Sequence, residues 1–179
     1  MENLELRMYG LVNYQLTGIQ QGIQFLHGVV EYGQMANEKG GDILEQYNEW
    51  ADIHKTVILL NGGTTNLNSE KPGTLNQHLQ TLKEKGVFCA SFHEPDLGNQ
   101  LTGVVFLVDE RVFNKEKYPD FAFTNQNQKT PGYGMWSNDP LKPEFLNENE
   151  AKRWQDWVQS IGGETNLWLR FWLKNFRLA

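Results

Sequence analysis

Several absences restrict what this chain can be. Cys89 is the single cysteine, so no internal disulfide can form, and a cytosolic setting is the expectation. No apolar run approaches the roughly 20 residues that span a bilayer, which predicts no membrane segment. The first ten residues, MENLELRMYG, contain neither a basic start nor an apolar stretch, so we expect no secretory signal.

Positive charge is also scarce. Lys and Arg total 16 against 22 Asp and Glu, giving a net charge of −6. This balance argues against broad binding to duplex DNA but not against a local pocket for a small anion. His54, His78 and His93 lack metal-ligand spacing, so we expect neither a metal nor another cofactor. The stretch NGGTTN at 61–66 matches neither a dinucleotide fingerprint nor a phosphate loop.

What is present indicates an α/β protein. The chain has 179 residues, of which 39% are hydrophobic, enough for one core and an extension. Apolar runs alternate with segments of helical period, which predicts a four-stranded mixed sheet with helices on both faces over residues 1–108. The expected strands are 7–16, 55–60, 87–92 and 101–108, and the expected helices are 17–33, 43–50 and 74–85.

The first helix is central to the functional interpretation. Thr17 is a good N-cap, and Gln20 three residues later completes the pattern of a capping box. An apolar row follows at helical spacing, and so does a polar row of Gln20, Gln24 and His27. The apolar row is Ile19, Ile23, Leu26 and Val30. Because ligands bind near the carboxyl ends of strands in open α/β sheets, the polar row is a candidate site.

Residues 109–179 have a different character. Residues 109–145 are rich in proline, asparagine and aromatic side chains, which predicts an irregular segment packed down on the protein. We expect helices over 147–160 and 165–177, both rich in tryptophan, docked on the core or presented to a partner.

Three blocks of sequence resemble the type 2 peptidyl-tRNA hydrolases and their bacterial and phage relatives. The blocks are YGLVNYQLTG…QFLHGVVEYG, NEWADIHKTVILL and FHEPDLGNQLTGVVFLV, within residues 6–108. The terminal FRLA is also similar to phage-encoded relatives. The resemblance implies a four-stranded mixed sheet, commonly a homodimer, and a site that acts at the 3′ end of tRNA.

The resemblance also assigns residues. Gln24 and His27 match the family's Gln and His, Glu94 its acidic residue, and Thr102 its threonine. The catalytic lysine of the family falls at Gln20, which carries no charge. The candidate ligand-binding residues are Thr17, Gln20, Gln24, His27, Glu94, Asn99 and Thr102, and the catalytic ones, if the protein is an enzyme, are His27, Glu94 and Thr102.

Loss of the lysine favours binding over catalysis, because a lysine polarises a scissile ester as a point charge and an amide does not. The first hypothesis is therefore a protein that sequesters a small nucleotide-derived ligand, as a phage protein could do in the host cytoplasm against nucleotide signalling. The second is an active peptidyl-tRNA hydrolase in which Lys55 or a basic residue of the extension replaces the missing charge. The third is an interaction module that binds a protein through the Trp-rich tail.

Purely structural roles for the same residues remain open as alternatives to these three hypotheses. Gln20 and Gln24 could be solvated helix residues, His27 a satisfied and partly buried histidine, and Glu94 a loop carboxylate. Thr102 could be no more than a good strand residue. The tryptophans of the last two helices could serve the core or a dimer contact.

Overall fold

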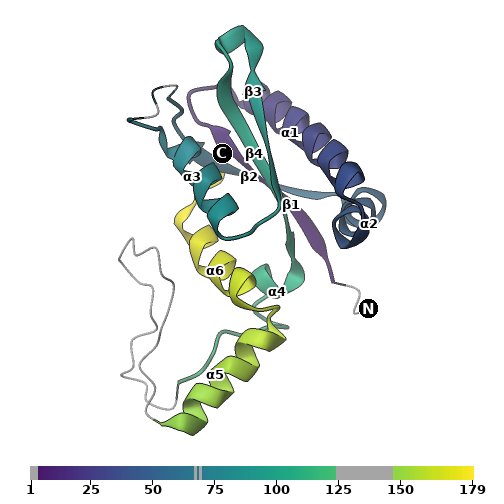
Figure 1. Cartoon of the computed structure of the whole chain (residues 1–179), viewed down its shortest axis with the longest axis vertical. Coiled ribbons are helices and arrows are strands. Elements are labelled where there is room, and N and C mark those ends of the chain that lie inside the picture. Colours follow the sequence, from purple (N-terminus) through teal and green to yellow (C-terminus); the bar gives the residue numbers. More distant parts are fainter. Residues whose placement is uncertain (1–3, 67, 69, 124–146) are drawn as a thin grey trace. The chain divides into compact units, whose positions relative to one another are not determined.

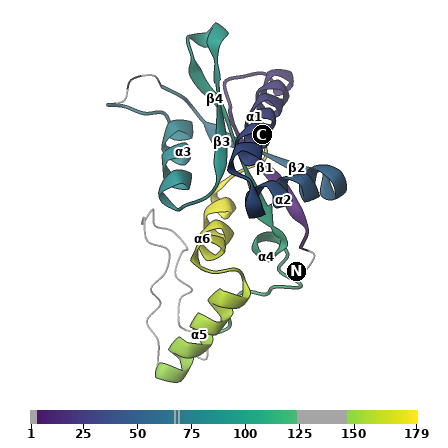
Figure 2. The same ribbon diagram turned by 45° about the vertical axis from the view of Figure 1, so that its right-hand side comes forward.

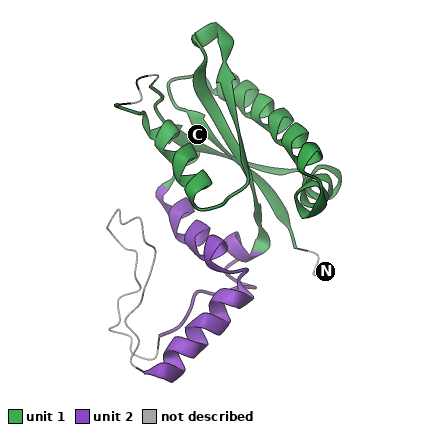
Figure 3. Ribbon diagram, in the orientation of Figure 1, with its two compact units in different colours: residues 1–110, 176–179 green, residues 111–175 purple. Residues whose placement is uncertain are grey.

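The structure is a computed structural model that describes residues 4–66, 68, 70–123 and 147–179. The chain forms two units: unit 1 contains residues 1–110 and 176–179, and unit 2 contains residues 111–175 (Figure 3). The boundary falls close to the expected one after residue 108. The last four residues, however, belong to unit 1 and not to the C-terminal extension.

Unit 1 is built on the expected four-stranded mixed sheet, in the order β2-β1-β4-β3 (Figure 1). The strands are β1 (Leu6–Asn13), β2 (Thr56–Gly63), β3 (Cys89–Glu94) and β4 (Gln100–Asp109). β1 pairs parallel to β2 and antiparallel to β4, and β3 pairs antiparallel to β4. The two central strands are almost wholly buried, which explains their continuous apolar sequence.

Helices cover both faces of this sheet, as the sequence predicts (Figures 1 and 2). Gly10 of β1 lies against Phe25 of α1 (Gly18–Lys39), whereas the next residue, Leu11, lies on the side of Leu75 of α3 (Thr74–Glu84). Successive residues of a strand point to opposite faces. The two helices therefore pack on opposite faces, and α1 lies on the face that carries the candidate site, where Tyr47 and Trp50 from the following segment join its core.

Helix α1 begins where the sequence predicts and ends later. The capping box is formed, since the Thr17 side chain accepts from the Gln20 amide and the Gln20 side chain accepts from the Thr17 amide. The helix continues to Lys39 and stops at Gly40, whose φ of 68° suits glycine. The chain then forms α2 (Gly41–Glu49) and a π-helical turn, η1 (Trp50–His54), before β2.

The apolar row that the helical spacing indicates on α1 is not the row that faces the sheet. The buried face consists of Phe25, Gly28, Val29, Tyr32 and Ala36, with Gln24 at its edge. The row Ile19, Ile23, Leu26 and Val30 is exposed. Both rows have helical spacing, so periodicity alone could not choose between them. The larger aromatic set faces the sheet because it buries more apolar surface.

The contact between α1 and β1 gives a first prediction. A Cβ on Gly10 would lie 2.3 Å from the Phe25 ring, whereas a Cβ on Gly22 would meet nothing within 4 Å. We expect Gly10→Ala to lower the free energy of unfolding by about 1–3 kcal/mol through overpacking. Gly22→Ala in the same unit should instead raise it by about 0.5–1 kcal/mol. Urea denaturation of both variants checks this, and equal effects would contradict the packing argument.

The chain ends on the edge of the sheet. Leu178 forms an antiparallel bridge with Leu60 of β2, the Asn61 amide donates to the Arg177 carbonyl at 2.9 Å, and the Ala179 amide donates to the Leu59 carbonyl at 3.1 Å. The Phe176 ring packs on His78 of α3 at 4.8 Å. The C-terminal residues thus cover part of the otherwise unpaired β2 edge.

Unit 2 has a core of its own. Its helices are α5 (Glu148–Ser160) and α6 (Glu164–Trp172), followed by a 3₁₀ turn, η3 (Leu173–Asn175); a short helix, α4 (Glu110–Phe113), leads into it. The core contains Trp154, Val158, Ile161 and Leu167, against which Tyr118, Phe121, Phe123, Trp157 and Phe171 pack. The expected Trp-rich helices are therefore present. Residues 124–146, including the aromatics Tyr133 and Trp136, lie outside the described residues.

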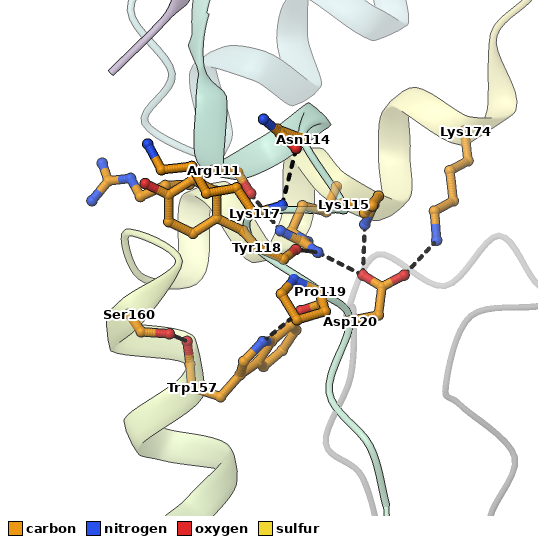
Figure 4. A network of polar contacts seen from close by, with 11 residues as sticks. Arg111, Asn114, Lys115, Lys117, Tyr118, Pro119, Asp120, Trp157, Ser160 and Lys174 are labelled. Atoms are coloured by element: carbon orange, nitrogen blue, oxygen red, sulfur yellow. Dashed lines mark hydrogen bonds and ion pairs between the residues drawn. The ribbon is translucent and has the colours of Figure 1, made fainter. Parts of the chain in front are cut away.

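A buried arginine, Arg170, forms hydrogen bonds with three residues of unit 2. Arg170 donates to the backbone carbonyls of Arg111 and Tyr118 and to the carboxylate of Asp120. Figure 4 shows Asp120 between Lys115 and Lys174, whose ammonium groups lie 2.5 and 3.7 Å from its oxygens. Arg170 has a fully buried side chain, so these bonds are what compensate its charge.

None of the helices in the described part of the chain is long and apolar enough to cross a membrane.

Candidate functional site

Gln24 is the centre of the candidate site. Its side-chain Nε2 donates to Glu94 Oε2 at 2.6 Å, and its Oε1 accepts from the Thr102 hydroxyl at 2.7 Å. The residue is only 7% exposed. α1, the end of β3 and the start of β4 are thus joined through one amide, and three of the candidate residues chosen from the sequence lie together.

Thr102 reaches Gln24 because of a β-bulge. Phe92 of β3 pairs with Gly103 of β4 and the next residue, His93, pairs with Leu101, which leaves Thr102 without an opposite partner. A bulge re-aims the extra side chain. The hydroxyl of Thr102 lies 3.3 Å from the Phe92 carbonyl as well, and the residue is completely buried. Thr102 therefore orients Gln24 and is not accessible as a nucleophile.

Glu94 stands at the end of β3 and is half-buried. Its Oε1 accepts from the Asp96 amide at 3.4 Å and so caps the turn η2 (Pro95–Leu97). Asn99 follows with a φ of 64°, and its amide donates to the Glu94 carbonyl at 2.9 Å. Asn99 thus shapes the turn that holds Glu94, and no hydrogen bond joins it to Gln24 within the described ranges.

His27 lies one turn after Gln24 on α1. Its ring is tilted against Phe92, with ring centroids 4.4 Å apart. The Nδ1 atom is buried and has no hydrogen-bond partner among the described residues. No bond links His27 to Glu94 in that part of the chain. The structure therefore presents an imidazole beside an aromatic ring, not a histidine–carboxylate pair.

Thr17 and Gln20 have a structural task at the start of α1. The Gln20 Oε1 accepts from both the amide and the hydroxyl of Thr17 at 3.0 Å, so its oxygen is committed to the capping box. The neighbouring Gln21 anchors the helix to the end of β1, because its Nε2 donates to the Asn13 and Leu16 carbonyls at 3.3 and 3.1 Å. These hydrogen bonds hold the start of α1 against the end of β1, and Gln24 is positioned with it.

Sequence reasoning missed Phe92 and the bulge at Thr102. Phe92 gives no signal of its own, because it sits in an ordinary apolar strand pattern. The bulge depends on the register between β3 and β4, which a single sequence does not reveal.

The site has no positive charge of its own. Neither residues 8–38 nor residues 86–110, which supply all its side chains, contain a Lys or Arg. In the described residues no group of three or more His, Cys, Asp and Glu side chains could hold a metal ion. The site therefore offers one carboxylate, one oriented amide and an aromatic flank, which suit a ligand with hydrogen-bond donors and a flat ring.

No protein-family model matches this chain, and no curated protein matches its sequence.

Proposed function

We propose that unit 1 binds a small nucleotide-derived ligand beside Gln24 without cleaving it. The observation that carries this is the fixed amide of Gln24, which Thr102 and Glu94 hold in one orientation. Because Gln24 is itself buried, its part is to hold the half-buried carboxylate of Glu94 in place, and that carboxylate can recognise the edge of a base or the hydroxyls of a ribose. The resemblance of the sequence blocks to type 2 peptidyl-tRNA hydrolases supports a nucleotide over other flat ligands.

The chemistry of the site indicates how such a ligand is held. The carboxylate of Glu94 accepts hydrogen bonds, so it suits the N–H groups of a base or a ribose diol. The ring of Phe92 beside His27 offers an apolar flank for the base. Because the site lacks Lys and Arg, phosphate groups of the ligand point away from it towards solvent.

The same contacts argue against efficient ester hydrolysis. The position of the family's lysine is held by Gln20, whose amide oxygen is engaged in the helix cap. Thr102 is buried and bonded. Of the catalytic candidates only His27 and Glu94 remain within reach of a substrate. The alternative remains a hydrolase in which a basic residue from elsewhere, such as Lys55, supplies the charge.

The Trp-rich tail has a sufficient structural explanation. Trp154 and Trp168 are buried, and Trp154 belongs to the core of unit 2. No observation in the described residues favours the third hypothesis, a protein-binding module formed by these tryptophans. For the first hypothesis, nucleotide binding, we propose sequestration of the nucleotide in the cytoplasm as the biological setting. If the gene is carried by a phage, this is the cytoplasm of the infected host.

Native mass spectrometry and calorimetry with a nucleotide panel test the proposal, with a peptidyl-tRNA cleavage assay on the same preparation. We expect an intact nucleotide to bind, no turnover, and at least tenfold weaker binding for Glu94→Gln. Gln34→Ala, an exposed glutamine on the same helix, is the control and should bind normally. Turnover that is lost in Glu94→Gln or His27→Ala would establish the hydrolase instead, and no binding to any nucleotide would refute the proposal.

A further inference from the structure

In the described part of the chain, the Glu94 carboxylate keeps an acceptor position on each of its two oxygens. A carboxylate has about four such positions, two on each oxygen. The structure uses one on each, because Gln24 Nε2 donates to Oε2 at 2.6 Å and the Asp96 amide donates to Oε1 at 3.4 Å. The carboxylate is therefore held in place from both sides, and each oxygen can accept one more hydrogen bond.

A carboxylate held in this way selects a ligand with two neighbouring donors. Its oxygens accept a parallel pair of hydrogen bonds, as they do from the two N–H groups of an arginine. Among the four bases of RNA, guanine alone has adjacent N–H donors on one edge, at N1 and the 2-amino group. Adenine and cytosine place a ring acceptor beside their amino group, and uracil has one N–H between two carbonyls. In those three bases an acceptor would face a carboxylate oxygen, which has no donor to offer.

The ring of Phe92 favours a base over a ribose as the group that Glu94 recognises. Phe92 contacts His27 of α1. Glu94, two positions later on β3, contacts Gln24 of the same helix, so both side chains lie on the α1 face of the sheet. Phe92 is only partly buried. A purine can stack on this ring while its edge pairs with the carboxylate, whereas a ribose diol supplies two donors but cannot stack.

The charge of the site disfavours recognition through phosphate. Residues 8–38 and 86–110, which supply its side chains, contain no Lys or Arg. A phosphate beside Glu94 would meet a carboxylate of its own sign. The selectivity of the site must therefore come from the base, and the phosphates contribute little to it.

We propose that the site is selective for guanine, which donates from N1–H and the 2-amino group to the two oxygens of Glu94 and stacks on Phe92. The inference rests on the proposed function, because it specifies which nucleotide-derived ligand unit 1 takes. Gln24 is a positioning residue in this arrangement, since it holds Glu94 and is itself buried.

Calorimetry of the full, unmodified chain with a series of nucleosides tests the selectivity. Guanosine and GMP should bind about equally, because the site supplies no partner for phosphate. Inosine lacks only the 2-amino group, so it should bind about tenfold more weakly than guanosine, and adenosine should bind about a hundredfold more weakly. 2′,3′-Dideoxyguanosine should bind like guanosine, because the ribose hydroxyls are not the donors to Glu94.

Two variants separate the pairing from the stacking. Glu94→Gln should weaken guanosine binding at least about tenfold and reduce the preference for guanosine over adenosine, because an amide offers one donor and one acceptor. Phe92→Leu should weaken guanosine and inosine by a similar factor of about ten and keep the ratio between them, since stacking does not depend on the base. Gln34→Ala, on the exposed face of α1, is the control and should match the unmodified chain. Circular dichroism checks that each variant is folded.

The possible results distinguish this proposal from the proposed function. Equal binding of guanosine, inosine and adenosine would overturn guanine selectivity and leave nucleotide binding intact. Loss of binding with 2′,3′-dideoxyguanosine would assign Glu94 to the ribose instead. If Glu94 acted only on the fold, Glu94→Gln would weaken every nucleoside alike, and that result would also overturn the pairing. If none of these nucleosides and no nucleotide binds, the proposed function itself fails, and guanine selectivity fails with it.

Discussion

Replacing Gln24 with leucine should destabilise unit 1 and abolish ligand binding together. The substitution removes the acceptor of the Thr102 hydroxyl and the donor to Glu94 in one step. The buried Thr102 hydroxyl then keeps only its longer contact, 3.3 Å to the Phe92 carbonyl, and loss of the shorter bond costs about 1–3 kcal/mol. The half-buried carboxylate adds a smaller loss because water can reach it. We expect the free energy of unfolding to fall by about 2–3 kcal/mol, measured from the urea midpoint at unchanged slope.

Two further variants separate this interpretation from simple loss of packing. Gln24→Glu has nearly the same shape but places a second carboxylate 2.6 Å from Glu94. The pair holds one proton more tightly than it would in the unfolded chain, so the variant should be least stable at pH 7. It should regain stability as the pH falls through the raised pKa of the pair, with the recovery complete by about pH 4, near the unfolded value. Gln34→Leu, on the exposed face of the same helix, should change stability by less than about 0.5 kcal/mol. A Gln24→Glu stability that is independent of pH would contradict the direct bond to Glu94.

The sequence predicts the parts of the site that depend on local patterns. Thr17 and Gln20 form the capping box that their spacing indicates, and the α/β alternation correctly gives a four-stranded mixed sheet. These features depend on residues within a few positions of one another. The grouping of Gln24 with Glu94 and Thr102 came from the resemblance, since no local rule links residues 70 and 78 positions apart.

The remaining features depend on tertiary packing. Two apolar rows on α1 have the same period, and the row with Phe25 turns inward because it buries more apolar surface, in the space that Gly10 of β1 leaves for its ring. The bulge that turns Thr102 towards α1 is a property of strand register. The return of Leu178 to the β2 edge joins residues more than one hundred positions apart, and the short sequence FRLA gives no sign of this pairing.

Arg170→Met is expected to give the largest loss of stability in unit 2. The guanidinium is the hydrogen-bond donor to the Arg111 and Tyr118 carbonyls and to Asp120, and methionine fills a similar volume with no donor. We expect the free energy of unfolding of unit 2 to fall by about 3 kcal/mol. All tryptophans except Trp50 lie within residues 111–175. In a Trp50→Phe background, tryptophan fluorescence measured during denaturation therefore follows the unfolding of unit 2. Lys152→Met on the exposed face of α5 is the control.

The pH dependence of unit 2 identifies which bond to Arg170 matters. Burial alone would raise the pKa of Asp120, but hydrogen bonds from Lys115 and Arg170 and the charge of Lys174 outweigh it and lower the pKa to about 2. A carboxyl with a folded pKa below its unfolded value stabilises the fold above about pH 4 and loses this contribution as the pH falls towards 2. Because Asp120 is 44% exposed, solvent screening keeps the contribution within about 1 kcal/mol.

Asp120→Asn should remove this acid sensitivity while keeping most of the stability, since the two backbone carbonyls still hold Arg170. If Asp120→Asn proves as damaging as Arg170→Met, the carboxylate and not the carbonyls is the main partner of the buried charge.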